Sequence, residues 1–280
     1  MLSYKHAFHA GNHADVLKHS ALVHILTYLK RKAPPLVYID THAGAGGYSL
    51  LDAEALKTAE FSRGAALLWK AGDRPEMVGD YLNLLRGVNP DGGLAVYPGS
   101  PQIAARLLGE KDRLRLFELH NNEYRGLTAR FAKDPRVKLF NSDGLQGLLA
   151  SLPPAQSRAL VLIDPSYEIK SDYEAVTETL IKAYKKFAVG VFMLWYPVVE
   201  RRRVQRLEQA IRQSGVRRIV QFELSVRPDA FNDGMTGSGL FVVNPPWTLQ
   251  ASMDETLPYL AATLGESGRG VFRSETLVGE

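Results

Sequence analysis

The sequence contains no cysteine, which excludes disulfide bonds, thiolate nucleophiles and metal sites built on sulfur. It also has no apolar run of about 18 residues, so we expect no membrane-spanning helix. The first residues, Met1 to His6, lack the apolar core of a signal peptide. These missing features favour a soluble cytoplasmic protein that does not associate with a membrane.

Hydrophobic residues make up 45% of the 280 positions and charged residues 23%, so the chain is neither disordered nor fibrous. The net charge of +4 is modest, but the positive side chains are clustered. Such clusters fit contacts with nucleic-acid phosphates, although solvated helix faces carry similar groups. The main clusters are 30–32, Lys182 with Lys185 and Lys186, 201–203 with Arg206, and Arg212 with Arg217 and Arg218.

Apolar segments typical of strands alternate with helical segments along most of the chain. This alternation predicts an α/β fold with a mainly parallel, doubly wound sheet. The last two strands, joined through a turn-rich segment, could form an antiparallel hairpin at the far side of the sheet. The expected strands are 36–40, 113–119, 137–140, 159–164, 189–195, 218–226 and 239–243.

The connection between Asp40 and Arg113 is far longer than one crossover helix requires. Its composition predicts two helices, roughly 53–70 and 75–88, before a cluster of turn residues. We therefore expect a single domain over residues 1–280 with a helical insertion at about 50–95. A further helix should follow over 101–108, with Ser100 as its N-cap.

The segment 161–168 is the most informative part of the sequence. An apolar strand ends there in Asp164, followed by Pro165 and Tyr167. Open α/β sheets bind ligands beyond the carboxyl ends of their strands. The Asp164 carboxylate and the Pro165 carbonyl can accept hydrogen bonds, and the Tyr167 ring can stack on a base. This combination suits the exocyclic amino group of a nucleobase.

Three other strand ends carry residues that suit a nucleoside. The first strand is followed by a turn with Gly44 and Gly46, which lets a ligand approach the backbone. Glu118 ends the second strand, where a carboxylate can receive ribose hydroxyls, and Asp143 follows the third, where it can accept from an adenine amino group. Each signal alone is ordinary, but together they predict a nucleoside cofactor. The acceptors and ring at Asp164 favour methyl transfer from S-adenosylmethionine to a base nitrogen.

A second motif of similar type follows a later apolar run, at 244–247 (Asn-Pro-Pro-Trp). It trails a late strand that we expect near the edge of the sheet, far along the chain from the glycine turn. We therefore favour Asp164 over Asn244. The alternative interpretation of 244–247 is a rigid turn that caps the strand.

The N-terminal segment 4–19 holds four of the seven histidines. No glutamate adjoins a histidine at the spacing of zinc proteases, and no second ligand cluster follows, so we expect no metal. Asn12 or Asp15 can cap a helix that runs to Tyr28. Lys18 and His19 then lie on this helix, where they either line the cofactor pocket or face solvent.

With these residues assembled, the chain resembles the bacterial 23S ribosomal RNA adenine-N6 methyltransferases of the RlmJ type. The resemblance covers nearly the whole length and is carried by 4–19, 40–46, 97–101, Glu118, 143–144 and 162–167. It implies a Rossmann-like domain that methylates the N6 amino group of a specific adenine in 23S ribosomal RNA. It also implies that Asp164 is the catalytic acceptor, with Pro165 and Tyr167 beside it, and that Tyr4 touches the RNA. By the resemblance, the residues that contact the cofactor are His19, His42, Ser100, Glu118, Asp143 and Gly144. To these we add Lys18, Gly44 and Asp164 from the motifs described above.

One departure from the family pattern Asp-Pro-Pro-Tyr is Ser166, which replaces the second proline. Proline fixes its own φ and restricts the preceding residue, so serine relaxes the loop that aims the Pro165 carbonyl. We expect activity to be retained at a lower rate. Two alternatives stay open: a DNA adenine-N6 methyltransferase, and a non-catalytic RNA-binding protein weakened at Ser166. We expect a monomer whose partner is 23S ribosomal RNA, either free or in an early assembly intermediate.

Overall fold

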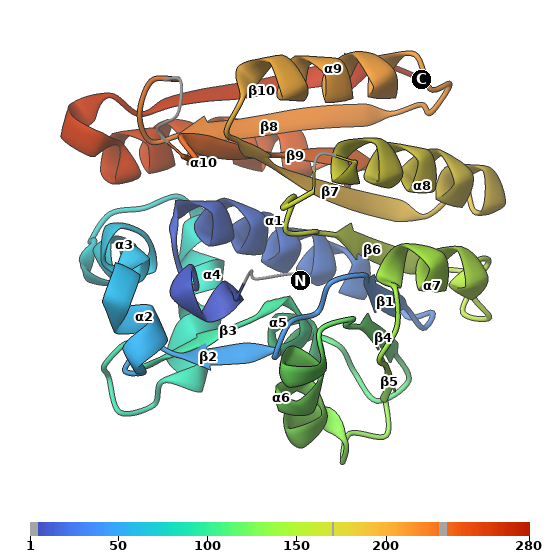
Figure 1. The fold of residues 1–280 in the computed structure, drawn as a ribbon, viewed down its shortest axis with the longest axis horizontal. Helices are drawn as coiled ribbons and strands as arrows, with labels where there is room; N and C mark the ends of the chain where they lie inside the picture. The colour runs from blue at the N-terminus through green and yellow to red at the C-terminus, as the bar shows by residue number, and fades with distance from the viewer. Residues whose placement is uncertain (1–4, 170, 230–233) are drawn as a thin grey trace.

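In a computed structural model, which describes residues 5–169, 171–229 and 234–280, eight strands form one sheet in the order β10-β8-β9-β7-β6-β1-β4-β5 (Figure 1). The strands are β1 (Val37–Asp40), β4 (Arg113–Phe117), β5 (Val137–Phe140), β6 (Ala159–Ile163), β7 (Val191–Val198), β8 (Ile219–Ser225), β9 (Gly237–Val243) and β10 (Val271–Val278).

The sheet is mainly parallel, which confirms the predicted Rossmann-like α/β fold class. Strands β1, β4, β5, β6 and β7 pair in parallel with one another. Strand β9 is antiparallel to both β7 and β8, so the antiparallel hairpin was predicted correctly. The hairpin lies at the far side of the sheet from β4 and β5, as predicted, but the edge there is formed by β10, which was not predicted.

Helices cover both faces of the sheet (Figure 1). The strand β1 shows why, because Tyr38 packs into one buried cluster while Val37 and Ile39 pack into the other. The Tyr38 side carries α1 (His13–Lys30), α5 (Ser100–Leu107), α6 (Asn121–Phe131) and α10 (Leu249–Leu264). The opposite side carries α7 (Gly144–Ser151), α8 (Asp172–Lys186) and α9 (Arg201–Arg212).

The long connection after β1 contains more elements than the two expected helices, of which the one predicted over about 75–88 is confirmed as α4 (Glu76–Val88). The elements are β2 (Gly47–Ser49), α2 (Ala53–Thr58), the 3-10 turn η2 (Glu60–Arg63), α3 (Ala65–Lys70), α4 and β3 (Val96–Pro98). The helix expected over 53–70 is broken where Ala59 adopts a left-handed conformation. A Cβ at Gly64 would lie 2.2 Å from the Gly11 carbonyl oxygen, so the chain here packs backbone to backbone against the start of α1.

Two helix starts decide where functional side chains point. Asn12 caps α1 by accepting from the amides of Ala14 and Asp15, which frees the Asp15 carboxylate for other contacts. The predicted N-cap at Ser100 is wrong, because Gly99 occupies that position and Ser100 is the first helical residue.

Short 3-10 turns η1 (His6–Phe8) and η3 (Glu266–Gly268) complete the elements. Over the part of the chain that is described, no helix has the length and hydropathy to cross a bilayer.

Candidate functional site

A cleft of about 580 Å³ opens where β1, β4 and β6 end. This volume is within the range of small-molecule and cofactor pockets. Its lining includes every described residue that the sequence predicted for the site: Lys18, His19, His42, Gly44, Ser100, Glu118, Asp143, Gly144, Asp164, Pro165 and Tyr167. Tyr4, the predicted RNA contact, lies outside the described residues.

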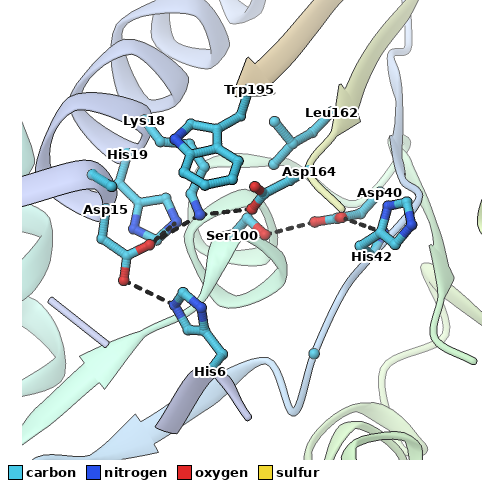
Figure 2. A network of polar contacts seen from close by, with 12 residues as sticks. His6, Asp15, Lys18, His19, Asp40, His42, Ser100, Leu162, Asp164 and Trp195 are labelled. Atoms are coloured by element: carbon cyan, nitrogen blue, oxygen red, sulfur yellow. Dashed lines mark hydrogen bonds and ion pairs between the residues drawn. The ribbon is translucent and has the colours of Figure 1, made fainter. Parts of the chain in front are cut away.

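Lys18 joins the buried carboxylate of Asp15 to the partly buried carboxylate of Asp164 at the cleft (Figure 2). Its Nζ donates to Asp164 Oδ2 at 2.6 Å and lies 2.9 Å from Asp15 Oδ1. Asp15 also accepts from the Gly11 amide and binds His6 Nε2 at 2.9 Å. Sequence reasoning considered Asp15 only as a possible helix cap and missed its role in holding Lys18.

The charges of this cluster depend on one another. Burial acts to lower the pKa of Lys18, but Asp15 and Asp164 outweigh it and raise that pKa, so the ammonium stays charged. Burial raises the pKa of Asp164, and Lys18 opposes the rise. Lys18 binds Oδ2, and no hydrogen bond to the other oxygen of Asp164, a residue that lines the cleft, is found among the described residues. The site therefore presents one open acceptor atom.

Tyr167 is fixed beside Asp164 by aromatic neighbours. Its hydroxyl donates to the Trp195 carbonyl at 2.7 Å, and its ring centroid lies 4.5 Å from that of Tyr173 and 5.9 Å from that of Trp195. Its φ of 53° is left-handed, a strained conformation of the kind found at functional sites. Trp195 was missed, because an aromatic residue inside an apolar strand gives no signal of a site.

Asp40, at the end of β1, organises the turn that follows it. This buried carboxyl accepts from the Tyr38 hydroxyl at 2.7 Å, the Ser100 hydroxyl at 2.7 Å and the His42 amide at 3.2 Å. Burial raises its pKa to about 6 despite these hydrogen bonds. Ser100 therefore supports Asp40 as well as lining the cleft.

Replacing Asp40 by asparagine should flatten the pH dependence of stability. Its pKa is raised from 3.8 to about 6, so between these values the folded protein holds a proton that the unfolded chain has lost. The free energy of unfolding from this group therefore falls as pH rises through that window, by about 3 kcal/mol in total. Urea unfolding at pH 4 and pH 7 should show wild type losing about that much more than Asp40→Asn. Equal losses would contradict the assignment, and Asp91→Asn on an exposed turn is the control.

The glycine turn is clamped by Glu118. Gly44 has a φ of 57°, which favours glycine, and its amide donates to Glu118 Oε2 at 2.8 Å. The other carboxylate oxygen accepts from the His120 amide at 2.7 Å. Burial raises the pKa of Glu118. The carboxylate is thereby held at the cleft wall in a fixed orientation.

Asp143 and Gly144 bring the end of β5 against the end of β1. Asp143 caps α7 through Oδ1, which accepts from two backbone amides at 2.8 and 3.1 Å. A Cβ at Gly144 would lie 1.8 Å from the Thr41 carbonyl oxygen, so only glycine permits this approach. His42 lines the same wall, and burial lowers its pKa to about 4, which keeps it neutral.

The donor and acceptor set of this wall fits a nucleoside cofactor. The carboxylates of Glu118 and Asp143 can accept from ribose hydroxyls and an amino group, and the turn at Gly44 lets a ligand come close to the backbone. The close approach of Gly144 to Thr41 brings the Asp143 carboxylate to the same cleft that Glu118 lines. The residues present therefore fit S-adenosylmethionine.

The rival motif at Asn244 lies away from the cleft lining. Strand β6 is parallel to β7, and β9 is antiparallel to β7. The carboxyl end of β9 therefore lies at the opposite end of the strands from the carboxyl end of β6. Asn244 Nδ2 donates to the carbonyls of Ala188 and Gly190 at 2.8 and 2.7 Å, just before β7 begins. The expectation of an edge-side strand was wrong, and strand direction is what separates Asn244 from the cleft.

Several cationic side chains of the predicted clusters are engaged within the protein. Arg201 binds Glu223 and Asp229, and Arg212 binds Glu208 and Glu275. These arginines stabilise the fold as well as adding positive charge to the surface. Within residues 5–169, 171–229 and 234–280, no group of three or more histidines and carboxylates is placed to hold a metal ion.

Comparison with known proteins assigns the chain to a family. Residues 33–278 match the family model described as "RsmJ: Ribosomal RNA large subunit methyltransferase D, RlmJ". The chain is 47% identical over 270 residues to the Ribosomal RNA large subunit methyltransferase J of Escherichia coli strain K12, covering 96% of each chain. It is 46% identical to the protein of the same name from Haemophilus influenzae, covering 100% of both.

A solved structure agrees with this assignment. A crystal structure of a Legionella pneumophila protein superposes with a TM-score of 0.89 at 36% sequence identity, and covers 96% of this chain and 98% of that one. Matches over nearly the full length in sequence and in fold leave no separate part of the chain to be explained. The chain belongs to the RlmJ family of ribosomal RNA large subunit methyltransferases.

Proposed function

We propose that the cleft binds S-adenosylmethionine and an adenine of 23S ribosomal RNA, and that Asp164 and the Pro165 carbonyl receive the N6 amino group. The chain is an S-adenosylmethionine-dependent ribosomal RNA methyltransferase by family. The observation that carries the site assignment is the Asp164 carboxylate, which lines the cleft at the end of β6 and is bound by Lys18 through Oδ2 alone among the described residues, so that Oδ1 remains available as an acceptor.

The adenine amino nitrogen is a poor nucleophile, because its lone pair is delocalised into the ring. Asp164 Oδ1 and the Pro165 carbonyl oxygen accept its two hydrogens and shift electron density toward nitrogen. When bound, the cofactor supplies a methyl group activated by its positively charged sulfur. Lys18 opposes the effect of burial on the pKa of Asp164, which keeps the carboxylate ionised and able to accept.

Tyr167 provides the stacking surface for the base. Base–aromatic stacking contributes about 1–3 kcal/mol. The hydrogen bond to the Trp195 carbonyl fixes the ring before the base arrives, so little side-chain entropy is lost on binding. The target base must leave the RNA stack to reach the cleft.

Residues of the cleft lining would hold the cofactor. Glu118 and Asp143 would receive its ribose hydroxyls and its adenine amino group, and the turn at Gly44 would let it come close to the protein backbone. His19, His42, Ser100 and Gly144 complete this set, and all of these residues line the cleft.

Methyl transfer to hypomodified RNA tests the function directly. Wild-type protein should incorporate label from methyl-labelled cofactor into 23S ribosomal RNA from cells lacking this modification, and digestion should yield N6-methyladenosine. Unlabelled RNA should compete, and duplex DNA should not. Competition by DNA would support the DNA enzyme instead, and RNA binding without single-turnover transfer would support the non-catalytic alternative raised by Ser166.

We also propose that the protein acts as a monomer in the cytoplasm, on free 23S ribosomal RNA or an early assembly intermediate. Residues 1–280 form one methyltransferase domain, with residues about 50–95 as its insertion, and Tyr4 touches the RNA. Naked 23S ribosomal RNA should therefore be methylated faster than mature large subunits, while light scattering gives the mass of one chain. Faster methylation of mature subunits would exclude this order.

Replacing Asn244 by alanine should lower stability but leave methyl transfer intact. The change removes two hydrogen bonds to Ala188 and Gly190 and places alanine at a φ of 51°. We expect a loss of about 1–3 kcal/mol in the free energy of unfolding. Methyl transfer at 25 °C should stay within about twofold of wild type, as expected for a residue outside the cleft. Loss of transfer in a folded variant would place Asn244 in the reaction.

A further inference from the structure

A buried series of hydrogen-bonded side chains joins the segment after β1 to the cleft. His19 Nδ1 lies 2.8 Å from the Tyr97 hydroxyl, and this hydroxyl lies 3.0 Å from that of Tyr81. All three side chains are almost fully buried. Tyr81 comes from α4, Tyr97 from β3 and His19 from α1, where it lines the cleft. We refer to Tyr81, Tyr97 and His19 as the tyrosine relay.

The Asp15 carboxylate favours one direction of the hydrogen bonds in the relay. The second ring nitrogen of His19, Nε2, lies 3.9 Å from Asp15 Oδ1 (Figure 2). Burial acts to raise the pKa of Asp15, but its contacts with His6 and the Lys18 ammonium outweigh burial and hold that pKa well below its usual value, so Asp15 is a carboxylate. A bare Nε2 lone pair would be repelled by that carboxylate, whereas an Nε2–H is attracted.

Burial lowers the pKa of His19 to about 3, so the neutral ring carries a single proton. With that proton on Nε2, Nδ1 must accept, and the Tyr97 hydroxyl donates to it. The Tyr97 oxygen is then left to accept from the Tyr81 hydroxyl. All the donors of the relay point from α4 toward the cleft.

We propose that Tyr81 and Tyr97 are positioning residues that fix His19 in the Nε2–H tautomer, and that this N–H binds the carboxylate of the amino-acid part of the cofactor. A neutral donor held by a second hydrogen bond at its other nitrogen is oriented before the ligand arrives. The proposal rests on the proposed function for the identity of the cofactor. It also gives the helical segment after β1 a part in cofactor binding.

Two ligands that differ in the amino-acid part, which carries the carboxylate, test the relay without any methyl transfer. S-adenosylhomocysteine carries the amino-acid part, and 5′-methylthioadenosine lacks it. By calorimetry, Tyr97→Phe should weaken S-adenosylhomocysteine binding about tenfold and leave 5′-methylthioadenosine binding within about twofold. Tyr81→Phe should have a smaller effect in the same direction. Equal weakening of both ligands would mean a general structural role and would overturn the proposal.

A matched control and a spectroscopic readout separate the relay from simple destabilisation. Tyr196→Phe removes another buried hydroxyl, bound to Glu223 and Gln221 outside the cleft, and should leave both affinities unchanged. Nitrogen NMR of the His19 ring should show a protonated Nε2 in wild type and mixed tautomers in Tyr97→Phe. A protonated Nδ1 in wild type would overturn the proposal. Because these readouts need no RNA, they hold or fail independently of methyl transfer.

Discussion

Replacing Asp164 by alanine should lower the rate constant for methyl transfer about a thousandfold. The change removes the open acceptor, Oδ1, and leaves the adenine amino group with the Pro165 carbonyl alone. S-adenosylhomocysteine binding should change much less than transfer, because Glu118, Asp143 and the turn at Gly44 remain. Single-turnover transfer with labelled cofactor measures the first effect and calorimetry the second. Transfer within tenfold of wild type would remove Asp164 from the mechanism.

The isosteric change Asp164→Asn sharpens this prediction. Lys18 donates to one Asp164 oxygen, so in the variant it should bind the single amide oxygen. The amide NH₂ then turns toward the cleft, where it opposes the hydrogens of the substrate amino group. Asp164→Asn should therefore be nearly as inactive as Asp164→Ala despite its similar shape. Substantial activity in the asparagine variant would show that Lys18 does not direct the carboxylate.

Replacing Lys18 by methionine should give the second largest effect. It leaves Asp15 and Asp164 buried without the ammonium that joins them, and breaking such a buried pair costs about 3–5 kcal/mol of stability. At pH 7 we expect methyl transfer to fall at least about a hundredfold, because Asp164 must be ionised to accept.

The pH profile distinguishes this electrostatic role from simple loss of structure. Burial raises the pKa of Asp164 and Lys18 opposes the rise, so the pKa should climb further in Lys18→Met. The acid limb of the kcat/KM profile should therefore move to higher pH, with partial recovery of activity in alkali. Lys18→Arg, which keeps the charge, should retain the wild-type limb. An unshifted limb in a folded Lys18→Met variant would contradict this role.

The sequence allowed the strand-end residues of the site to be predicted. Consecutive parallel strands place their carboxyl ends at one edge, so Glu118, Asp143 and Asp164 had to approach one another once the strands were recognised. The pairing of Lys18 with Asp164 could not be derived in this way, because the two residues are 146 positions apart and meet only through the packing of α1. Trp195 could not be predicted either, because an aromatic residue in an apolar strand looks like any other core residue.

The errors in the fold have local physical causes. Strand β10 at the sheet edge has four consecutive polar residues, 273–276, between apolar ends and only one buried residue, so it shows neither the alternation nor the apolar run expected of a strand. The break near Ala59 and Gly64 reflects contact with the Gly11 backbone, which no local pattern shows. Strand β9 was recognised but misplaced, because insertion between β7 and β8 is decided by long-range pairing.

A structure with S-adenosylhomocysteine and adenosine bound together is the most direct test of the central claim. We predict that the adenosine amino nitrogen lies within hydrogen-bond distance of Asp164 Oδ1 and the Pro165 carbonyl oxygen, with its base against Tyr167 and the cofactor sulfur in line beyond it. An adenosine held with its amino group turned away from Asp164, or seated beside Asn244, would contradict the account.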